Sequence, residues 1–219
     1  FYALVREKSD VSELTKAGIQ LIIDNKDYNK LAIEMKSKKI YGVLHLASLF
    51  VKDHNQKEIS QLIESNISYG TNLLESCHQA NVKWFINTGT FWQHFNNEIY
   101  NPANLYAASK QAFQAISKYY INRTDIKFIT LELNDTYGPG DTRKKIINLL
   151  MNTYRTGKLL KMSAGDQLMD LSYIDDVVDG FSSLIEQIEL SNIENGSCFS
   201  LYAKERKSLK EIRSEERRV

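Results

Sequence analysis

The sequence predicts an α/β fold built on a doubly wound parallel sheet. Three features of the 219 residues indicate this. Short, nearly continuous apolar runs alternate with longer helical patterns, and such runs are typical of strands covered on both faces. Strand–helix–strand alternation implies right-handed crossovers and therefore parallel strands. The only prolines, Pro102 and Pro139, both fall between the predicted elements.

Five apolar runs are predicted to be the strands of this sheet. They cover residues 2–5, 18–23, 41–47, 82–87 and 126–133. The helical pattern at 60–80 has one broad apolar face, formed by Leu62, Ile63, Ile67, Leu73, Leu74 and Cys77. The pattern at 105–121 places together Ala108, Ala112, Ala115, Ile116 and Tyr119. After Pro139 we expect helices at 143–155 and 173–189, a loop up to Asp170, and a short strand at 197–202.

Composition excludes several classes of protein. Lys and Arg total 28 against 27 Asp and Glu, so no strong field would attract nucleic acid or an acidic membrane surface. No apolar run approaches the length of a membrane span. Cys77 and Cys198 belong to no paired motif, which favours a reducing compartment, the cytoplasm. No metal is expected, because metal-ligand spacing is absent from His45, His54, His78 and His94.

The sharpest local signal is Tyr106 followed four residues later by Lys110. On a helix these side chains share a face, and an ammonium beside a phenol lowers the pKa of the phenol. Such a tyrosine can exchange a proton near neutral pH, and the lysine can bind a ribose hydroxyl. The alternative interpretation is a surface tyrosine beside a solvated lysine. Upstream, Thr90 ends a predicted strand, where its hydroxyl would orient a substrate oxygen or merely stabilise a turn.

Six motifs in fixed order make the sequence similar to a known family. They are Val43–Ala47, Asn66 with Gly70–Leu74, Thr88–Thr90, Tyr106 with Lys110, Tyr137–Asp141 and Tyr173–Val177. This order resembles the NAD(P)-dependent epimerase/dehydratase family of extended short-chain dehydrogenases/reductases, which have a Rossmann-like sheet. The resemblance implies an NAD(P)-binding domain at 1–140 and part of a substrate-binding region at 141–212. The charge-dense residues 213–219 are predicted to be a non-native tail without a role in folding.

The same resemblance assigns roles to individual residues. The catalytic group would be Thr90, Tyr106 and Lys110. The cofactor would be bound by Arg6, Asp24, Leu46, Ala47, Asn66, Lys110 and Thr136. The nucleotide-sugar substrate would contact Thr90, Asp135 and Arg143. Ordinary capping and turn hydrogen bonds are the alternative for Asn66 and Thr136, and solvent exposure is the alternative for Arg6 and Arg143.

The family's glycine-rich phosphate loop is missing from this sequence, and its first segment, Tyr2–Arg6, matches the family's second strand. We therefore expect truncation of the first strand, loop and helix, and poor cofactor binding by the chain as given. Arg6, at the end of that strand, would pair with a 2′-phosphate, which favours NADP over NAD.

Two departures from the family pattern narrow the expected substrate. Glu132 and Met169 stand where many members carry arginines, which argues against a plain UDP-glucose or UDP-glucuronate epimerase. The segments 134–139, 141–143 and 165–171 resemble CDP-abequose and CDP-paratose synthases, which reduce a CDP-linked 4-keto-3,6-dideoxysugar with NADPH during surface-polysaccharide biosynthesis. A 4-epimerase or dehydratase, or a non-catalytic cofactor-sensing or partner-binding protein, remains the alternative. The family also implies a homodimer through the helices beginning near Ser60 and Leu105.

Overall fold

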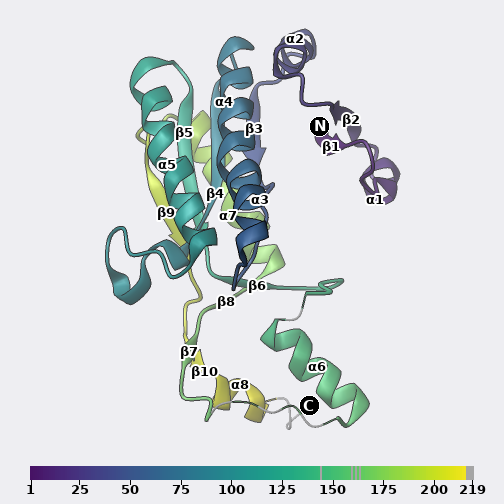
Figure 1. Cartoon of the computed structure of the whole chain (residues 1–219), viewed down its shortest axis with the longest axis vertical. Helices are drawn as coiled ribbons and strands as arrows, with labels where there is room; N and C mark the ends of the chain where they lie inside the picture. Colours follow the sequence, from purple (N-terminus) through teal and green to yellow (C-terminus); the bar gives the residue numbers. More distant parts are fainter. Residues whose placement is uncertain (144, 159, 161, 163, 216–219) are drawn as a thin grey trace.

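A four-stranded parallel sheet forms the centre of the molecule (Figure 1). The computed structural model describes residues 1–143, 145–158, 160, 162 and 164–215. The strand order is β3 (Gly42–His45), β4 (Trp84–Thr90), β5 (Lys127–Leu133) and β9 (Cys198–Leu201), and every pairing is parallel. Helices cover both faces of this sheet, so the predicted α/β class is confirmed.

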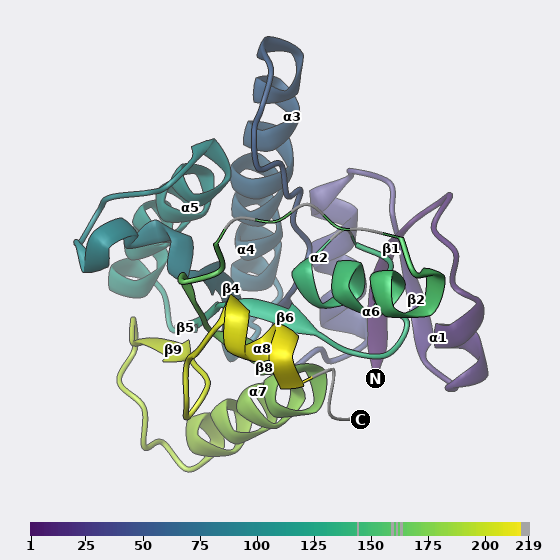
Figure 2. The same cartoon turned by 90° about the horizontal axis from the view of Figure 1, so that it is seen from below.

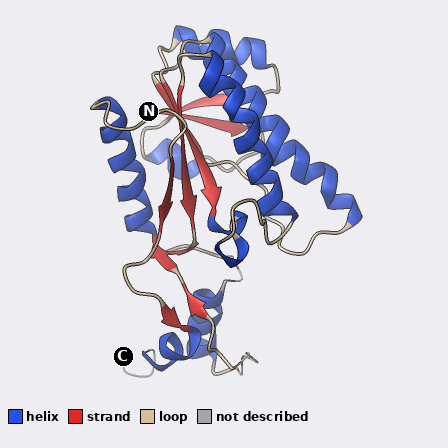
Figure 3. Ribbon diagram, turned by 90° about the vertical axis from the view of Figure 1, so that its left-hand side faces the viewer, coloured by secondary structure: helices blue, strands red, loops and turns tan. Residues whose placement is uncertain are grey.

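One face carries α4 (Tyr69–Gln79) and α5 (Leu105–Arg123), and the other carries α7 (Ile174–Glu189) (Figure 3). Alternating residues of the strands face opposite layers, because successive side chains of a strand point to opposite sides. Phe85 and Phe128 stack at 5.5 Å on the α4–α5 side. Ile86 and Ile129 pack with α7 on the other side. This alternation explains why consecutive apolar residues occur at Trp84–Ile86 of β4 and Phe128–Ile129 of β5.

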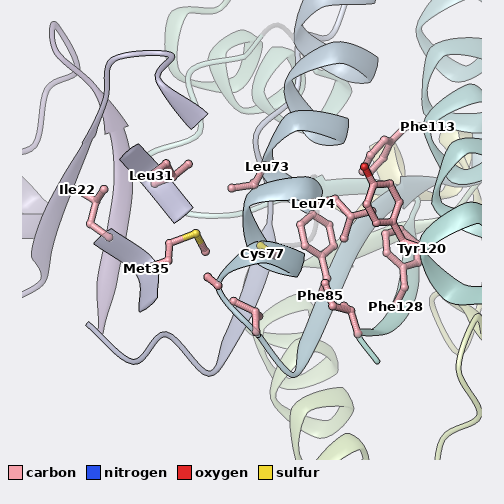
Figure 4. Close-up of a cluster of buried hydrophobic side chains, with 13 residues drawn as sticks. Ile22, Leu31, Met35, Leu73, Leu74, Cys77, Phe85, Phe113, Tyr120 and Phe128 are labelled. Carbon is pink, nitrogen blue, oxygen red and sulfur yellow. The ribbon is translucent and has the colours of Figure 1, made fainter. Parts of the chain in front are cut away.

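A second, two-stranded parallel sheet pairs β1 (Tyr2–Arg6) with β2 (Gln20–Asp24). The helices α1 (Ser12–Lys16) and α2 (Tyr28–Ser37), which were not predicted, belong to this part of the chain. Ile22, Leu31 and Met35 extend the core cluster that contains Leu73 and Cys77 (Figure 4). Within the described residues, β1 pairs only with β2 and β3 only with β4. The two sheets therefore share a core without sharing a backbone ladder.

The remaining elements lie beyond the carboxyl ends of the main strands. They comprise β6 (Asp135–Tyr137) paired with β8 (Leu171–Tyr173), β7 (Leu168–Met169) paired with β10 (Lys207–Ser208), α6 (Ile146–Thr156) and α8 (Leu209–Glu215). Figure 2 looks onto this region, which lies nearest the viewer. Among the described residues, no helix is both apolar and long enough to cross a membrane.

Three findings differ from the sequence-based expectations. The segment 174–201 supplies α7 and β9 to the main sheet, so the division at residue 140 does not coincide with the edge of that sheet. On α5, the predicted apolar stripe lies outward, and Ile116 and Tyr119 are exposed. The predicted tail begins inside α8, and its residues 216–219 lie outside the described residues.

Candidate active site

The candidate residues gather at the carboxyl ends of parallel strands, where an open α/β sheet binds its ligands. Arg6 ends β1 and Asp24 ends β2, and the two are partners in the strand register. Leu46 and Ala47 directly follow β3, and both are exposed. Thr90 ends β4. Strand topology therefore brings Arg6 and Asp24 to one end of the small sheet, and Leu46, Ala47 and Thr90 to one edge of the main sheet.

Asn66 joins two of the segments at this edge. It lies in the π-helical turn η2 (Glu64–Ser68) between α3 (Ile59–Ile63) and α4, and it is 1% exposed. Its Oδ1 accepts hydrogen bonds from the Leu49 amide at 2.8 Å and from Ser48 Oγ at 3.1 Å. Its Nδ2 donates to the Leu49 carbonyl and to Ser109 Oγ on α5, both at 2.9 Å. π-Helical turns occur often at functional sites, and this one holds the loop after β3 against α5.

Tyr106 lies in the first turn of α5. The side chain of Asn104 caps that helix by accepting the Ala107 amide at 2.9 Å. Burial raises the pKa of the Tyr106 phenol above its ordinary value, and a hydrogen bond with Ser48 lowers it by less. The expectation that Lys110 lowers this pKa is not supported, because Lys110 is not among the groups that shift it and burial disfavours the charged phenolate.

Lys110 lies one turn later on α5 and is 2% exposed. No hydrogen bond or ion pair of its ammonium occurs in the described part of the chain, although buried charges are ordinarily paired. Burial lowers the pKa of Lys110 to about 8. Its charge and, more strongly, burial lower the pKa of His45 to about 3. The edge therefore contains a buried cation whose three donor protons are available to a ligand.

Thr90 is held by the short turn that follows β4. Its Oγ1 accepts the Trp92 amide at 3.4 Å in η3 (Phe91–Gln93), and its own amide donates to Gln93 Oε1 at 3.0 Å. Gln93 Nε2 in turn donates to Gln111 and Gln114 on α5. Thr90 thus has the turn-stabilising role considered above, and its hydroxyl proton remains available for a substrate oxygen.

Asp135, Thr136 and Arg143 form a separate polar cluster around β6. Arg143 donates to both oxygens of Asp141 at 2.7 Å and to Thr136 Oγ1 at 3.3 Å. Lys145 Nζ lies 3.3 Å from Asp135 Oδ1. The side chain of Arg143 is 56% exposed. It therefore matches the alternative interpretation, an exposed arginine near the start of a helix. Contacts joining this cluster directly to Tyr106 are absent from the described interactions.

Two cavities lie away from Tyr106. One of about 250 Å³ is bordered by Leu21, Ile23, Asp24, Asn25, Lys30, Leu31 and Glu34. The other, of about 500 Å³, lies between the start of α2 and α4. The first includes Asp24, one of the residues expected to bind the cofactor. Among the described residues, no group of three or more His, Cys, Asp or Glu side chains is placed to hold a metal ion.

The residues present fit one end of a nicotinamide dinucleotide. Lys110 is 2% exposed, and its ammonium has no hydrogen-bond or ion-pair partner among the described residues, so it is suited to ribose hydroxyls. The other end of such a cofactor needs a cradle of backbone amides for its pyrophosphate. No glycine-rich segment among these 219 residues supplies that cradle.

Several residues at this edge were missed by sequence reasoning. Ser48 and Ser109 bond to Asn66, and Phe50 packs edge-on against Tyr106 with ring centroids 4.9 Å apart. Ser109 was visible inside the Tyr106–Lys110 motif as the hydroxyl between the two reactive residues. The contact of Phe50 with Tyr106 could not be predicted, because an isolated aromatic residue after a strand has many possible partners.

Comparison with known proteins shows the family to which this chain is similar. Residues 2–195 match the NAD dependent epimerase/dehydratase family. CDP-abequose synthase of Salmonella typhimurium is 28% identical over 150 residues, which are 67% of this chain and 48% of that protein. dTDP-D-glucose 4,6-dehydratase of Dictyostelium discoideum is 28% identical over 187 residues, which are 76% of this chain and 43% of that protein. The chain thus spans about half the length of these curated relatives.

A solved structure has the same fold. The structure of UDP-glucuronic acid 4-epimerase from Bacillus cereus in complex with NAD superposes with a TM-score of 0.81 at 22% identity, covering 95% of this chain and 68% of that one. The chain belongs to the NAD dependent epimerase/dehydratase family.

Proposed function

We propose that this member of the NAD dependent epimerase/dehydratase family reduces the 4-keto group of a nucleotide-linked deoxysugar, with CDP-4-keto-3,6-dideoxyglucose as the type of substrate. The observation that carries the proposal is the buried, unpaired Lys110 one turn from Tyr106 at the edge where Thr90 ends β4. Similarity to CDP-abequose synthase supports the sugar class.

Each residue has a defined task in this reaction. A bound reduced nicotinamide would supply the hydride that reaches C4 of the sugar, and it leaves as the oxidised cofactor. Tyr106 donates its phenolic proton to the C4 oxygen, so ketone, hydride and proton together give a secondary alcohol. Thr90 donates a hydrogen bond to the same oxygen, and Lys110 binds the ribose beside it. The raised pKa of Tyr106 keeps the phenol protonated at neutral pH, which is the form that reduction requires.

The polar cluster around β6 is proposed to bind the rest of the substrate. Arg143 presents a planar fork suited to diphosphate oxygens. It is paired with Asp141 in the structure, so binding would exchange one anionic partner for another. Asp135 would contact the sugar, and Thr136 would lie near the nicotinamide. Residues 141–173 and 202–212 would form the substrate-binding region around this cluster.

NADP is the proposed cofactor. Arg6 is exposed at the carboxyl end of β1, where its guanidinium would reach a 2′-phosphate. NAD is the alternative, and solved relatives such as the Bacillus cereus epimerase carry NAD. Asp24 ends the neighbouring strand, and Leu46 and Ala47 would lie beside the cofactor.

Two further functions remain alternatives. A 4-epimerase or dehydratase would use the same three residues, and the Dictyostelium dehydratase is as similar in identity as CDP-abequose synthase. A cofactor-sensing or partner-binding protein would not need Tyr106 and Lys110 together in one buried position.

NADPH oxidation, followed by absorbance with CDP-4-keto-3,6-dideoxyglucose and the protein expressed from its complete reading frame, tests the proposal. Tyr106→Phe should reduce kcat about 10²- to 10⁴-fold, because the acid is lost while the ring remains. Cofactor binding and the circular dichroism spectrum should stay unchanged. Undiminished turnover by Tyr106→Phe would refute the acid role.

The proposed assembly is a homodimer in the cytoplasm, through the helical segment that begins near Ser60 and runs through α3 and α4, and through α5. The outward stripe of α5 supports the dimer, since Tyr119 is 64% exposed and Ile116 lies beside it on the same face. Both cysteines are free, which supports a reducing compartment. Light scattering from the full-length protein checks the assembly, and a monomeric mass at micromolar concentration would contradict it.

A further inference from the structure

Three aromatic rings from distant parts of the sequence meet at the candidate active site. Phe50, in the loop after β3, lies edge-on to Tyr106 with ring centroids 4.9 Å apart and an interplanar angle of 81°. It also lies edge-on to Trp92, at 6.2 Å and 79°. Phe50 therefore bridges the ring of the proposed acid and a ring in the turn after Thr90.

The position of Phe50 is fixed, although its side chain is open to solvent. Phe50 is 54% exposed. The residue before it, Leu49, has both its amide and its carbonyl bonded to the buried side chain of Asn66. A large apolar ring held beside a reactive group and left half uncovered is suited to contact a ligand.

The Trp92 ring is fixed in a similar way. Its backbone amide donates to Thr90 Oγ1, and the next residue, Gln93, is fully buried and bonded to α5. Trp92 is thus two residues from the hydroxyl proposed to hold the substrate oxygen. Together Phe50 and Trp92 form an apolar wall that begins at the ring of Tyr106.

We propose that Phe50 and Trp92 are specificity-determining residues that select a sugar lacking a hydroxyl group next to the reacting carbon. The inference rests on the proposed 4-keto reduction and adds the residues that recognise the deoxygenated part of the sugar. A methylene or methyl group packs favourably against the ring edges. A hydroxyl placed there would lose its hydrogen bonds to water and gain none from two apolar rings.

The expected selectivity is modest, because an apolar pocket discriminates against an added hydroxyl by about 10²-fold at most. We expect the wild-type protein to favour CDP-4-keto-3,6-dideoxyglucose over CDP-4-keto-6-deoxyglucose, which differs by the hydroxyl at C3. The preference, measured as a ratio of kcat/KM values, should be about 10- to 100-fold.

Three variants of the full-length protein test the role of Phe50. Phe50→Asn supplies a polar partner for the extra hydroxyl, so the kcat/KM ratio should fall at least about tenfold. Phe50→Leu keeps an apolar surface and should retain most of the preference. The matched control is Phe95→Asn, since Phe95 is 55% exposed on the neighbouring turn η4 (Phe95–Asn97) and has no ring contact among the described residues.

The outcomes separate this inference from the proposed function. A ratio that falls in Phe50→Asn and persists in Phe50→Leu and Phe95→Asn supports the aromatic wall. A wild-type protein that reduces both sugars equally well, or a ratio that Phe50→Asn leaves unchanged, overturns it while leaving the 4-keto reduction intact. A wild-type protein that reduces neither sugar overturns the proposed function, and the inference fails with it. If Phe50→Asn does not fold, Trp92→Gln provides the same comparison with the same expected fall.

Discussion

Two polar clusters at the same end of the molecule are built in different ways. In the cluster around Asn66, Tyr106 and Lys110, Asn66 and Lys110 are buried, and Asn66 bonds to the loop after β3 and to α5. The cluster around Asp141 and Arg143 lies in the segment after β6, with the Arg143 side chain 56% exposed. The first cluster is held by hydrogen bonds of buried side chains, and the second by ion pairs that solvent can reach.

The difference matches the tasks proposed for the two clusters. Proton transfer needs groups held in place before the substrate arrives, and burial supplies that order. Binding of a nucleotide diphosphate needs an arginine that can change partners, and an exposed ion pair contributes little to stability. Loss of Asn66, which holds the first cluster in place, should therefore lower mainly stability, whereas loss of Arg143 in the second cluster should lower mainly substrate affinity.

The largest effect on stability is expected for Asn66→Ala. The change leaves the amide and the carbonyl of Leu49, together with Ser109, without their hydrogen-bond partner. Unsatisfied buried groups cost about 1–3 kcal/mol each, so the free energy of unfolding should fall by about 3 kcal/mol. Urea denaturation followed by circular dichroism measures it.

Asn152→Ala is the matched control for that experiment. Asn152 is exposed on α6, where substitutions usually change the free energy of unfolding by less than about 0.5 kcal/mol. Equal destabilisation by the two changes would contradict the view that buried contacts of Asn66 hold the catalytic edge together.

The next largest effect is expected from acid, which should lower the free energy of unfolding through His45 beside Lys110 and leave the Asp141–Arg143 pair ionised. Burial, and then the charge of Lys110, lower the pKa of His45 to about 3, whereas an unfolded histidine has a pKa of about 6.5. The unfolded state therefore binds the extra proton first, and stability is lost as the pH falls below about 6.5. Between pH 7.5 and pH 5 the free energy of unfolding should drop by about 2 kcal/mol through this residue.

The exposed pair behaves differently over that range. Hydrogen bonds from Arg143 lower the pKa of Asp141 to about 2, so this carboxylate stays ionised at pH 5. Denaturation of wild type and His45→Gln at pH 7.5 and pH 5 provides the test. The variant should lack about 2 kcal/mol of the acid-induced loss, and an identical loss in both proteins would exclude His45 as its source.

The smallest expected effect is a change in substrate affinity. Arg143→Ala in the full-length protein should raise the KM for the nucleotide sugar about tenfold, because one charged hydrogen-bonding partner of the diphosphate is lost. Its free energy of unfolding should change by less than about 0.5 kcal/mol. Arg155→Ala, at an exposed position in the last turn of α6, should leave KM unchanged. A KM rise shared by both variants would point to general surface charge instead.

The sequence predicted those features that depend on residues close together in the chain, namely apolar runs in strands and the spacing of side chains on one helix. All five predicted strands occur, and the apolar residues of β4 and β5 pack on both faces of the main sheet. Tyr106 and Lys110 were found because helical spacing brings them to one face. The apolar stripe predicted on α5 is not its buried face. The buried face contains polar residues, notably Ser109, Lys110 and Ser117, so the apolar pattern did not reveal it. The helix α2 was missed because only Leu31, Ala32 and Met35 are buried there among polar residues.

Contacts between distant segments were the hardest to foresee. Phe50, Trp92 and Tyr106 lie on three different elements, and no period in the sequence connects them. The raised pKa of Tyr106 was also unpredictable, since it depends on how deeply α5 is buried. Spacing reveals which residues share an element, whereas burial is a property of the whole fold.

Transfer of deuterium from NADPH to the sugar tests most directly whether the protein reduces a 4-keto sugar. The full-length protein would be incubated with NADPH deuterated at the transferred position of its nicotinamide and with CDP-4-keto-3,6-dideoxyglucose. We expect one deuterium at C4 of each sugar product and one NADPH consumed for each product formed. Interconversion of two C4 epimers without consumption of NADPH would contradict it and would establish an epimerase.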